Sequence, residues 1–470
     1  MSESAEQSSK PASAASVEQE TPERPGIWTL ALPSILGNLS YSIVGLAQTA
    51  FIAQLGAEAL AAIGAGQRIF FAMQAILMAV TAGTTALVAR AWGAGDYQEA
   101  SRVTMASLVL GGIMSAAIGI FGIVFATPVA SLFGLDAVTV DMAATNIRLF
   151  LAFNVIFAAN FILSAALRAS GDAWTPLWTS VGVNILNLPL MFLFIFGHLG
   201  LPEMGVAGVA VSAGIAFSVG TGLMTILWMR QRFQLKYVRG GWWRRSRLRA
   251  LLDIGYPAAV EQMVFQVGFF IFLILIGRAY GTEAFAAYNT GVNLLMVCMT
   301  VGFGFSIAGS TLVGQNLGAK DPEAATRSGW RALLYAMLSM GGLGLLIAFF
   351  ARDITGVVLS DEPLTAEYTV QFIWLLGAMM PLMAVEFTIG GALRGAGDTR
   401  FPLLATVLGL LVMRCGLAAV ATYLELPVFY VYASLVGDYM LKGVMLVWRF
   451  HRGKWKTLVS TEQMGIGQSA

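Results

Sequence analysis

Apolar stretches long enough to cross a lipid bilayer recur along almost the entire chain. A transmembrane helix needs about 20 consecutive apolar residues, and charged residues make up only 11% of the 470 residues, whereas a soluble globular protein carries about 25%. The sequence therefore predicts an all-α membrane protein with twelve spans. The expected spans are residues 27 to 55, 60 to 91, 103 to 133, 142 to 168, 174 to 197, 206 to 230, 250 to 278, 284 to 316, 327 to 351, 367 to 394, 401 to 424 and 427 to 449.

Lys and Arg concentrate in alternate connections between these spans. The link RQRFQLKYVRGGWWRRSRLR after the sixth span is strongly basic, and we assign Arg168 and Arg400 to links on the same side. The opposite links GLDAVTVD and HLGLPEMG contain no Lys or Arg. Because positively charged loops remain in the cytoplasm, both termini are predicted to be cytoplasmic.

The chain contains an internal repeat. LRASGDAWTP begins at Leu167 and LRGAGDTRFP begins at Leu393, 226 residues later. GAGDYQEASR and GAKDPEAATR are 225 residues apart, and LGAEALAAIGAG matches YGTEAFAAYNTG. Six crossings return a chain to its starting side, so the two halves are predicted to be parallel six-helix bundles. Carriers that work by alternating access place their substrate in the cleft between such bundles.

The repeat defines the expected domain organisation. A tail rich in Ser, Glu, Ala and Pro precedes the first bundle and is expected to be disordered. A basic cytoplasmic linker separates the bundles, and a second cytoplasmic tail ends the chain. The expected segments are residues 1 to 26, 27 to 230, 231 to 249, 250 to 450 and 451 to 470.

Several classes of function lack their residues in this sequence. It contains no phosphate-binding G-x-x-x-x-G-K-[ST] loop. The histidines are His198 and His451, and the cysteines are Cys298 and Cys415 within apolar runs, which argues against a histidine metal centre or a disulfide framework. We therefore expect neither an enzyme nor a nucleotide-binding or nucleic-acid-binding protein, and no organic cofactor.

Two carboxylates are predicted to lie inside the membrane. Glu261 stands about ten residues, or roughly 15 Å, from the cytoplasmic end of the seventh span, and Glu386 about 12 Å from that of the tenth. A charge at such depth costs at least about 2.5 kcal/mol and is functional by default. In low dielectric and without a compensating charge, these carboxyls favour the protonated state. They are the predicted coupling site for H+ or Na+, and the predicted metal ligands if the ion is Na+.

A structural role is the alternative for each carboxylate. The repeat aligns Glu386 with Asn160, so a polar group at this position is also explained by hydrogen bonding between helices. Asp438 and Lys442 are four residues apart on the last span, a spacing typical of a local ion pair.

Other polar residues within the spans are predicted to line a cavity or bind substrate. Arg68 and Arg414 each lie about 14 Å deep, and they indicate anionic or zwitterionic substrates or counter-ions for the glutamates, with extension to the membrane surface as the alternative. For the amides, hydrogen bonding between helices is equally consistent. These amides are Asn38, Gln48, Asn160 and Asn184 in the first half and Gln262, Gln266, Asn289 and Asn293 near Glu261.

The paired LR-x-x-GD motifs, the G-A-x-D loops, the ALP and GYP openings of spans one and seven, and the twelve spans resemble the MATE (multidrug and toxic compound extrusion) transporters of bacteria. The resemblance covers about residues 27 to 450. It implies a V-shaped pair of six-helix lobes, monomeric, in the inner membrane, that exports organic and often cationic drug-like compounds in exchange for Na+ or H+.

The resemblance also bears on individual residues. It implies a functional glutamate at Glu261, whereas the family's acidic residue in span ten usually falls one turn before Glu386, where this chain has Met383. In one branch, aspartates in spans one and five couple protons. Gln48 and Leu188 stand there, so a titratable mechanism in the first lobe is not expected.

Secondary antiport is the preferred interpretation. A flippase for lipid-linked saccharides is the first alternative and would need several arginines in the cleft to bind pyrophosphate. An uncoupled channel is the second alternative, and it would need neither buried carboxylates nor a duplicated scaffold.

Overall fold

The computed structural model describes residues 25–132, 136–358 and 362–458. Most of the two expected tails, residues 1 to 26 and 451 to 470, therefore lies outside the described residues. Within the described ranges the chain forms helices joined by short connections, with no strand.

The first half of the chain forms one helical bundle. Helices α5 and α6 meet at a 51° bend and together make one crossing. The helices of this half are α1 (Ile27–Ala53), α2 (Ala57–Gly93), α3 (Tyr97–Val124), α4 (Ala126–Ser131), α5 (Ala137–Ala152), α6 (Asn154–Ala169), α7 (Trp174–Phe196), the short η1 (His198–Gly200) and α8 (Val206–Met229).

The second half repeats this arrangement. Its first element, α9, is assigned 74 residues, but its backbone leaves helical geometry at Gly281, with φ 80° and ψ −171°, and contains two crossings. Glycine reaches this conformation without steric cost. The elements of this half are α9 (Arg245–Gly318), α10 (Pro322–Phe349), α11 (Ala351–Val358), α12 (Pro363–Gly395), α13 (Arg400–Thr406), the π-helical η2 (Val407–Arg414), α14 (Cys415–Tyr423), α15 (Val428–Arg452) and η3 (Lys454–Lys456).

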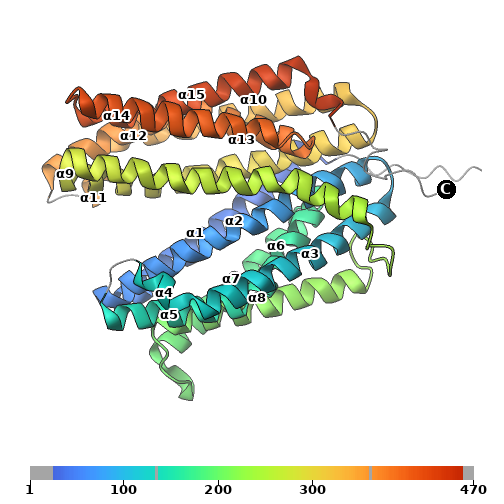
Figure 1. The fold of residues 1–470 in the computed structure, drawn as a ribbon, viewed down its shortest axis with the longest axis horizontal. Helices are drawn as coiled ribbons and strands as arrows, with labels where there is room; N and C mark the ends of the chain where they lie inside the picture. The colour runs from blue at the N-terminus through green and yellow to red at the C-terminus, as the bar shows by residue number, and fades with distance from the viewer. Residues whose placement is uncertain (1–24, 133–135, 359–361, 459–470) are drawn as a thin grey trace, which may run out of the picture.

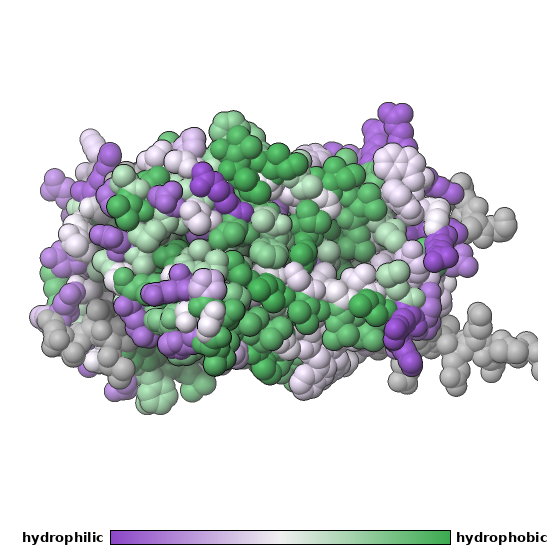
Figure 2. Space-filling model, turned by 90° about the horizontal axis from the view of Figure 1, so that it is seen from below, coloured by the Kyte–Doolittle hydropathy of each residue, from purple (hydrophilic) through white to green (hydrophobic). Residues whose placement is uncertain are grey.

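The helices match the twelve predicted crossings. In the described part of the chain, eight helices are long and apolar enough to span a bilayer, and the bent pair of α5 and α6 makes nine. The second crossing within α9, together with α2 and α15, completes the set of twelve. In Figure 2 most hydrophilic residues on the face in view lie toward the two ends, and hydrophobic residues dominate between them. The predicted fold class is confirmed.

The two bundles, called here the N-lobe and the C-lobe, form a V (Figure 1). They meet at the end where α2 and the second part of α9 finish and diverge toward the opposite end. At the closed end the backbones approach so closely that a Cβ on Gly93 would lie 1.8 Å from the Gln315 carbonyl oxygen, and one on Gly318 would lie 2.0 Å from that of Arg90.

Hydrogen bonds between the lobes accompany these glycine contacts. Gln315 Nε2 donates to the carbonyl oxygen of Ala169 at 2.9 Å, and Arg90 Nη2 donates to that of Ala396 at 3.3 Å. The repeated loop motifs stabilise the same end, because Asp96 accepts a hydrogen bond from the Glu99 backbone N–H and Asp321 accepts one from that of Ala324. Each aspartate thus caps the N-terminus of the helix that follows.

The basic linker, predicted as residues 231 to 249, is packed against the N-lobe. Arg247 and Glu99 form a buried ion pair with a 2.6 Å separation. Arg247 also donates hydrogen bonds to the carbonyl oxygens of Gly241 and Trp242. Phe233 and Leu235 are buried beside α3 and α8 residues. The linker is therefore fixed to the first lobe before α9 enters the second.

Candidate functional site

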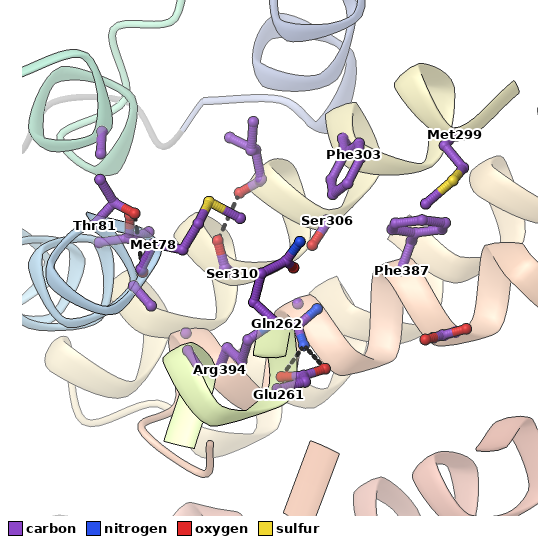
Figure 3. A pocket seen from close by; sticks show the side chains of 18 of the residues that line it. Met78, Thr81, Glu261, Gln262, Met299, Phe303, Ser306, Ser310, Phe387 and Arg394 are labelled. Atoms are coloured by element: carbon purple, nitrogen blue, oxygen red, sulfur yellow. Dashed lines mark hydrogen bonds and ion pairs between the residues drawn. The ribbon is translucent and has the colours of Figure 1, made fainter. Parts of the chain in front are cut away.

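A cavity of about 450 Å³ lies between the lobes near the closed end of the V. Helices α1, α2 and α6 line it from the N-lobe, and α9, α12, α13 and α15 line it from the C-lobe. Much of the wall is apolar or aromatic, contributed by Met78, Phe265, Met299, Phe303 and Phe387. Figure 3 shows Met78, Met299, Phe303 and Phe387 around a polar group formed by Glu261, Gln262 and Arg394.

Of the predicted site residues, the cavity brings together Glu261, Glu386, Gln262 and Asn38. Glu261 comes from the first part of α9 and Glu386 from α12. The two carboxylates predicted to share one lobe therefore line one cavity.

Glu261 forms an ion pair across the C-lobe wall. Arg394 Nη1 donates to both carboxylate oxygens, at 3.0 and 3.1 Å, and the Thr406 hydroxyl donates to Oε1 at 3.1 Å (Figure 3). The side chain of Glu261 is 17% exposed and that of Arg394 is 24% exposed. Glu261 therefore has a compensating charge, which Arg394 of α12 supplies. The pair still faces the cavity and remains open to water.

Glu386 also has a basic partner. Lys442 Nζ lies 3.3 Å from Glu386 Oε1 and 3.1 Å from Asp438 Oδ1, and Arg414 lies 2.5 Å from Asp438 Oδ2. These four side chains, here called the tetrad, comprise two basic and two acidic groups, of which Glu386 is partly exposed to the cavity and the other three are buried. The predicted pairing of Asp438 with Lys442 is confirmed, and Lys442 also supplies the compensating charge of Glu386.

The prediction that Arg414 faces the central cleft is wrong. Its side chain is 3% exposed and is enclosed within the C-lobe by Asp438 and by the rings of Phe272 and Tyr439. The π-helical segment η2 ends at Arg414 and turns it inward. Gly409 of η2 leaves room for the tetrad, since a Cβ there would lie 2.3 Å from Asp438 Oδ1.

Several predicted amides lie outside this cavity lining. Asn160 donates to the Thr221 hydroxyl at 3.1 Å, and Asn184 donates to the Ser40 hydroxyl at 2.7 Å, so both link helices within the N-lobe. Asn289 donates to a carbonyl of its own helix. The remaining residues outside the lining are Gln48, Gln266 and Asn293. Arg68 was also a predicted site residue, but its side chain is not among those that the structure describes.

The cavity contains an arginine that sequence reasoning assigned to a cytoplasmic link. Arg168 lies in the last turn of α6 and lines the N-lobe wall. Its repeat equivalent is Arg394. The paired LR motifs therefore place one arginine from each lobe at the same cavity, a signal that was present in the repeat.

Among the described residues, no group of three or more His, Cys, Asp or Glu side chains is arranged to hold a metal ion. A Na+ ion at Glu261 would therefore need neutral oxygen ligands, of which the Thr406 hydroxyl is the one already in contact.

Two parallel six-helix lobes around a shared cavity are the architecture of a membrane transporter whose substrate site lies between the lobes. The MatE family model matches residues 33–193 and 257–420, and the chain belongs to this family.

Curated relatives cover most of the chain. A probable multidrug resistance protein NorM from Thermotoga maritima is 29% identical over 454 residues, which span 93% of this chain and 94% of the relative. An FAD transporter from Shewanella oneidensis is 24% identical over 403 residues, spanning 84% and 87%.

Among solved structures, a multidrug resistance MATE family transporter of the MOP superfamily in an outward-facing conformation superimposes with a TM-score of 0.86 at 22% identity. The match covers 92% of this chain and 96% of that one. At this identity the likeness shows the fold alone.

Proposed function

We propose that this protein is a secondary active antiporter that exports organic compounds across a bacterial inner membrane in exchange for H+ or Na+, with Glu261 as the coupling carboxylate. The observation that carries the proposal is the position of Glu261 in the wall of the cavity between the lobes, inside the membrane and open to water. The multidrug resistance names of relatives such as the Thermotoga maritima protein support the export of drug-like compounds.

The ion pair between Glu261 and Arg394 suggests how binding of the coupling ion changes the arrangement of the lobes. A proton or Na+ on Glu261 competes with Arg394 for the same two carboxylate oxygens. Arg394 stands two residues before Ala396, whose carbonyl accepts a hydrogen bond from Arg90 across the closed end. Release of Arg394 therefore perturbs α12 next to a contact that keeps the V closed.

Coupling then follows from differential affinity. The ion favours the lobe arrangement in which Arg394 is released, and substrate favours the other, so each changes the population that the other encounters. The closed end carries the basic loops, which we assign to the cytoplasm. In this state the cavity opens outward, where the ion loads.

The test is dye transport into inside-out vesicles under an imposed pH gradient or an imposed Na+ gradient, applied separately. Ethidium and carboxyfluorescein serve as the cationic and anionic probes. Glu261→Gln removes the ion site but keeps the shape of the side chain, and we expect gradient-driven uptake of either dye to be lost. The matched control is Glu283→Gln, on an exposed residue of α9 beyond the Gly281 turn.

Full gradient-driven uptake by Glu261→Gln would overturn the assignment. The structure does not favour the flippase alternative, which would need several arginines in the cleft to bind pyrophosphate. Arg394 is already ion-paired, and Arg414 lies inside the C-lobe.

A further inference from the structure

We infer that Arg168 is the recognition site for an acidic group on the transported compound, so that the cavity accepts aromatic organic anions. This inference deepens the proposed function by naming a substrate class for the same cavity, and it rests on that proposal.

The C-lobe wall contains a trio of residues, Arg394, Glu261 and Thr406, joined by hydrogen bonds. The repeat places Arg168 at the position of Arg394 and Ser180 at that of Thr406, both 226 residues earlier.

The third member of the trio differs between the halves. Aligning ALP of α1 with GYP of α9 places Gly37 opposite Glu261, so the N-lobe has no carboxylate there. One turn further along α1, the Tyr41 hydroxyl donates to Ser180 at 3.1 Å. The N-lobe therefore keeps an arginine and a hydroxyl residue at the two repeat positions, and the hydroxyl has a phenol rather than a carboxylate as its partner.

This replacement leaves a positive charge in the cavity. A tyrosine hydroxyl is neutral at pH 7, and within the described ranges Arg168 forms no ion pair with a carboxylate. The two carboxylates that line the cavity are already engaged, Glu261 by Arg394 and Glu386 by Lys442. Among the described residues that line the cavity, the guanidinium of Arg168 is thus the charge without a carboxylate counter-ion.

A guanidinium in a partly dehydrated wall binds carboxylate, sulfonate or phosphate groups through paired, charge-assisted hydrogen bonds. The remainder of the cavity wall favours an apolar ring system, because Met78 lies on the N-lobe side and Phe303 and Phe387 lie on the C-lobe side. A volume of about 450 Å³ accommodates a small aromatic molecule. An aromatic acid fits both features of the wall.

The acidic group and the coupling ion use different residues. Arg168 lies in the N-lobe and Glu261 in the C-lobe, so the acid site can be tested by binding alone, without an ion gradient. Failure of the acid site and failure of the proposed antiport are therefore distinguishable.

The experiment measures binding of three naphthalene probes of nearly equal shape to the full-length protein in nanodiscs: 2-naphthoate, 2-naphthamide and 2-naphthylmethylammonium. A hydrogen-bonded charge contributes enough that we expect naphthoate to bind about 10-fold to 100-fold more tightly than naphthamide. Arg168→Gln should remove this preference, and Arg168→Lys should retain part of it because the charge remains.

Two controls separate recognition from folding and from general charge. Naphthamide binding by Arg168→Gln reports whether the apolar wall is intact. Arg400→Gln removes an exposed arginine that stacks over Tyr256 outside the cavity lining, and it should leave the acid preference unchanged. Glu261→Gln should abolish gradient-driven uptake while the acid preference persists.

The inference is overturned if naphthoate binds no better than naphthamide, or if Arg168→Gln keeps the preference for naphthoate. If the preference depends on Arg168 but no gradient drives uptake, the acid site stands and the antiport proposal fails.

Discussion

The closed end of the V offers a direct test of lobe movement through Gly93→Ala. Gly93 and Gly318 are repeat equivalents, as are Arg90 and Gln315, and each glycine packs on the carbonyl of the other lobe's long polar residue. The contact therefore follows the symmetry of the duplication. A methyl group at either glycine meets backbone, which cannot rotate away.

The energetic cost of Gly93→Ala follows from the distance between the added Cβ and the backbone of the other lobe. The added Cβ of Gly93→Ala would lie 1.8 Å from the Gln315 carbonyl oxygen, whereas real contacts of this kind almost never fall below 3.0 Å. The helices must separate by at least about 1 Å, and such overpacking costs about 1 to 3 kcal/mol. The cost applies to the state in which these backbones touch. The population of that state should therefore fall by about 5-fold to 150-fold relative to the state in which they part.

The assay is labelling of a single cysteine at Ser306, in the cavity wall, by a membrane-impermeant maleimide. The background lacks the buried Cys298 and Cys415. Gly93→Ala should increase labelling from the side of the basic loops and decrease labelling from the opposite side.

The matched control is Gly112→Ala in α3, where an added Cβ has no neighbour within 4 Å. Labelling should remain as in the parent protein. If Gly93→Ala and Gly112→Ala give the same labelling from both sides, the glycine contact does not control the opening of the closed end.

Three further variants test the ion pairs. Asp438→Asn leaves the buried Arg414 without its partner and should lower the free energy of unfolding by about 3 to 5 kcal/mol, seen as a lower melting temperature in detergent; an unchanged melting temperature would contradict the role given to the tetrad. Glu386→Gln should weaken ion-driven dye uptake without abolishing it, because Lys442 retains its second partner, and complete loss would make this carboxylate a coupling residue of equal rank. Glu99→Gln should lower the melting temperature by leaving the buried guanidinium of the linker unpaired, with the pH or Na+ dependence of uptake unchanged; a shift in that dependence would give the linker a role in coupling.

Features that depend on short stretches of sequence, or on the repetition of such stretches, were predictable. Crossings are runs of apolar residues, and the parallel lobes follow from the constant offset of the LR and G-A-x-D motifs. Glu261 could be singled out because a carboxylate in an apolar run is costly wherever the neighbouring helices lie.

The partners of the carboxylates could not be predicted in the same way. Arg394 is 133 residues from Glu261, and Lys442 is 56 residues from Glu386. Which helix faces which is decided by packing, including the close approach that Gly409 allows to Asp438. The role of Arg168 was also missed, because the positive-inside rule assigned this arginine to a cytoplasmic link. It lies in the last turn of a membrane helix and lines the cavity.

The difference between the two halves explains why duplication alone does not determine function. Both lobes place an arginine at the cavity, and both place a hydroxyl residue nearby, Thr406 or Ser180. A carboxylate in both halves would neutralise both arginines and provide two ion sites with no cation left for an acidic substrate. A phenol in both halves would remove Glu261, the carboxylate that we propose exchanges a proton or Na+. In the proposed division, the wall with Glu261 carries the ion and the wall with Arg168 and Tyr41 binds the organic acid. Tyr41→Glu should therefore reduce the preference for 2-naphthoate over 2-naphthamide while the Glu261 ion pair remains in place, and retention of the full preference would contradict this division between the lobes.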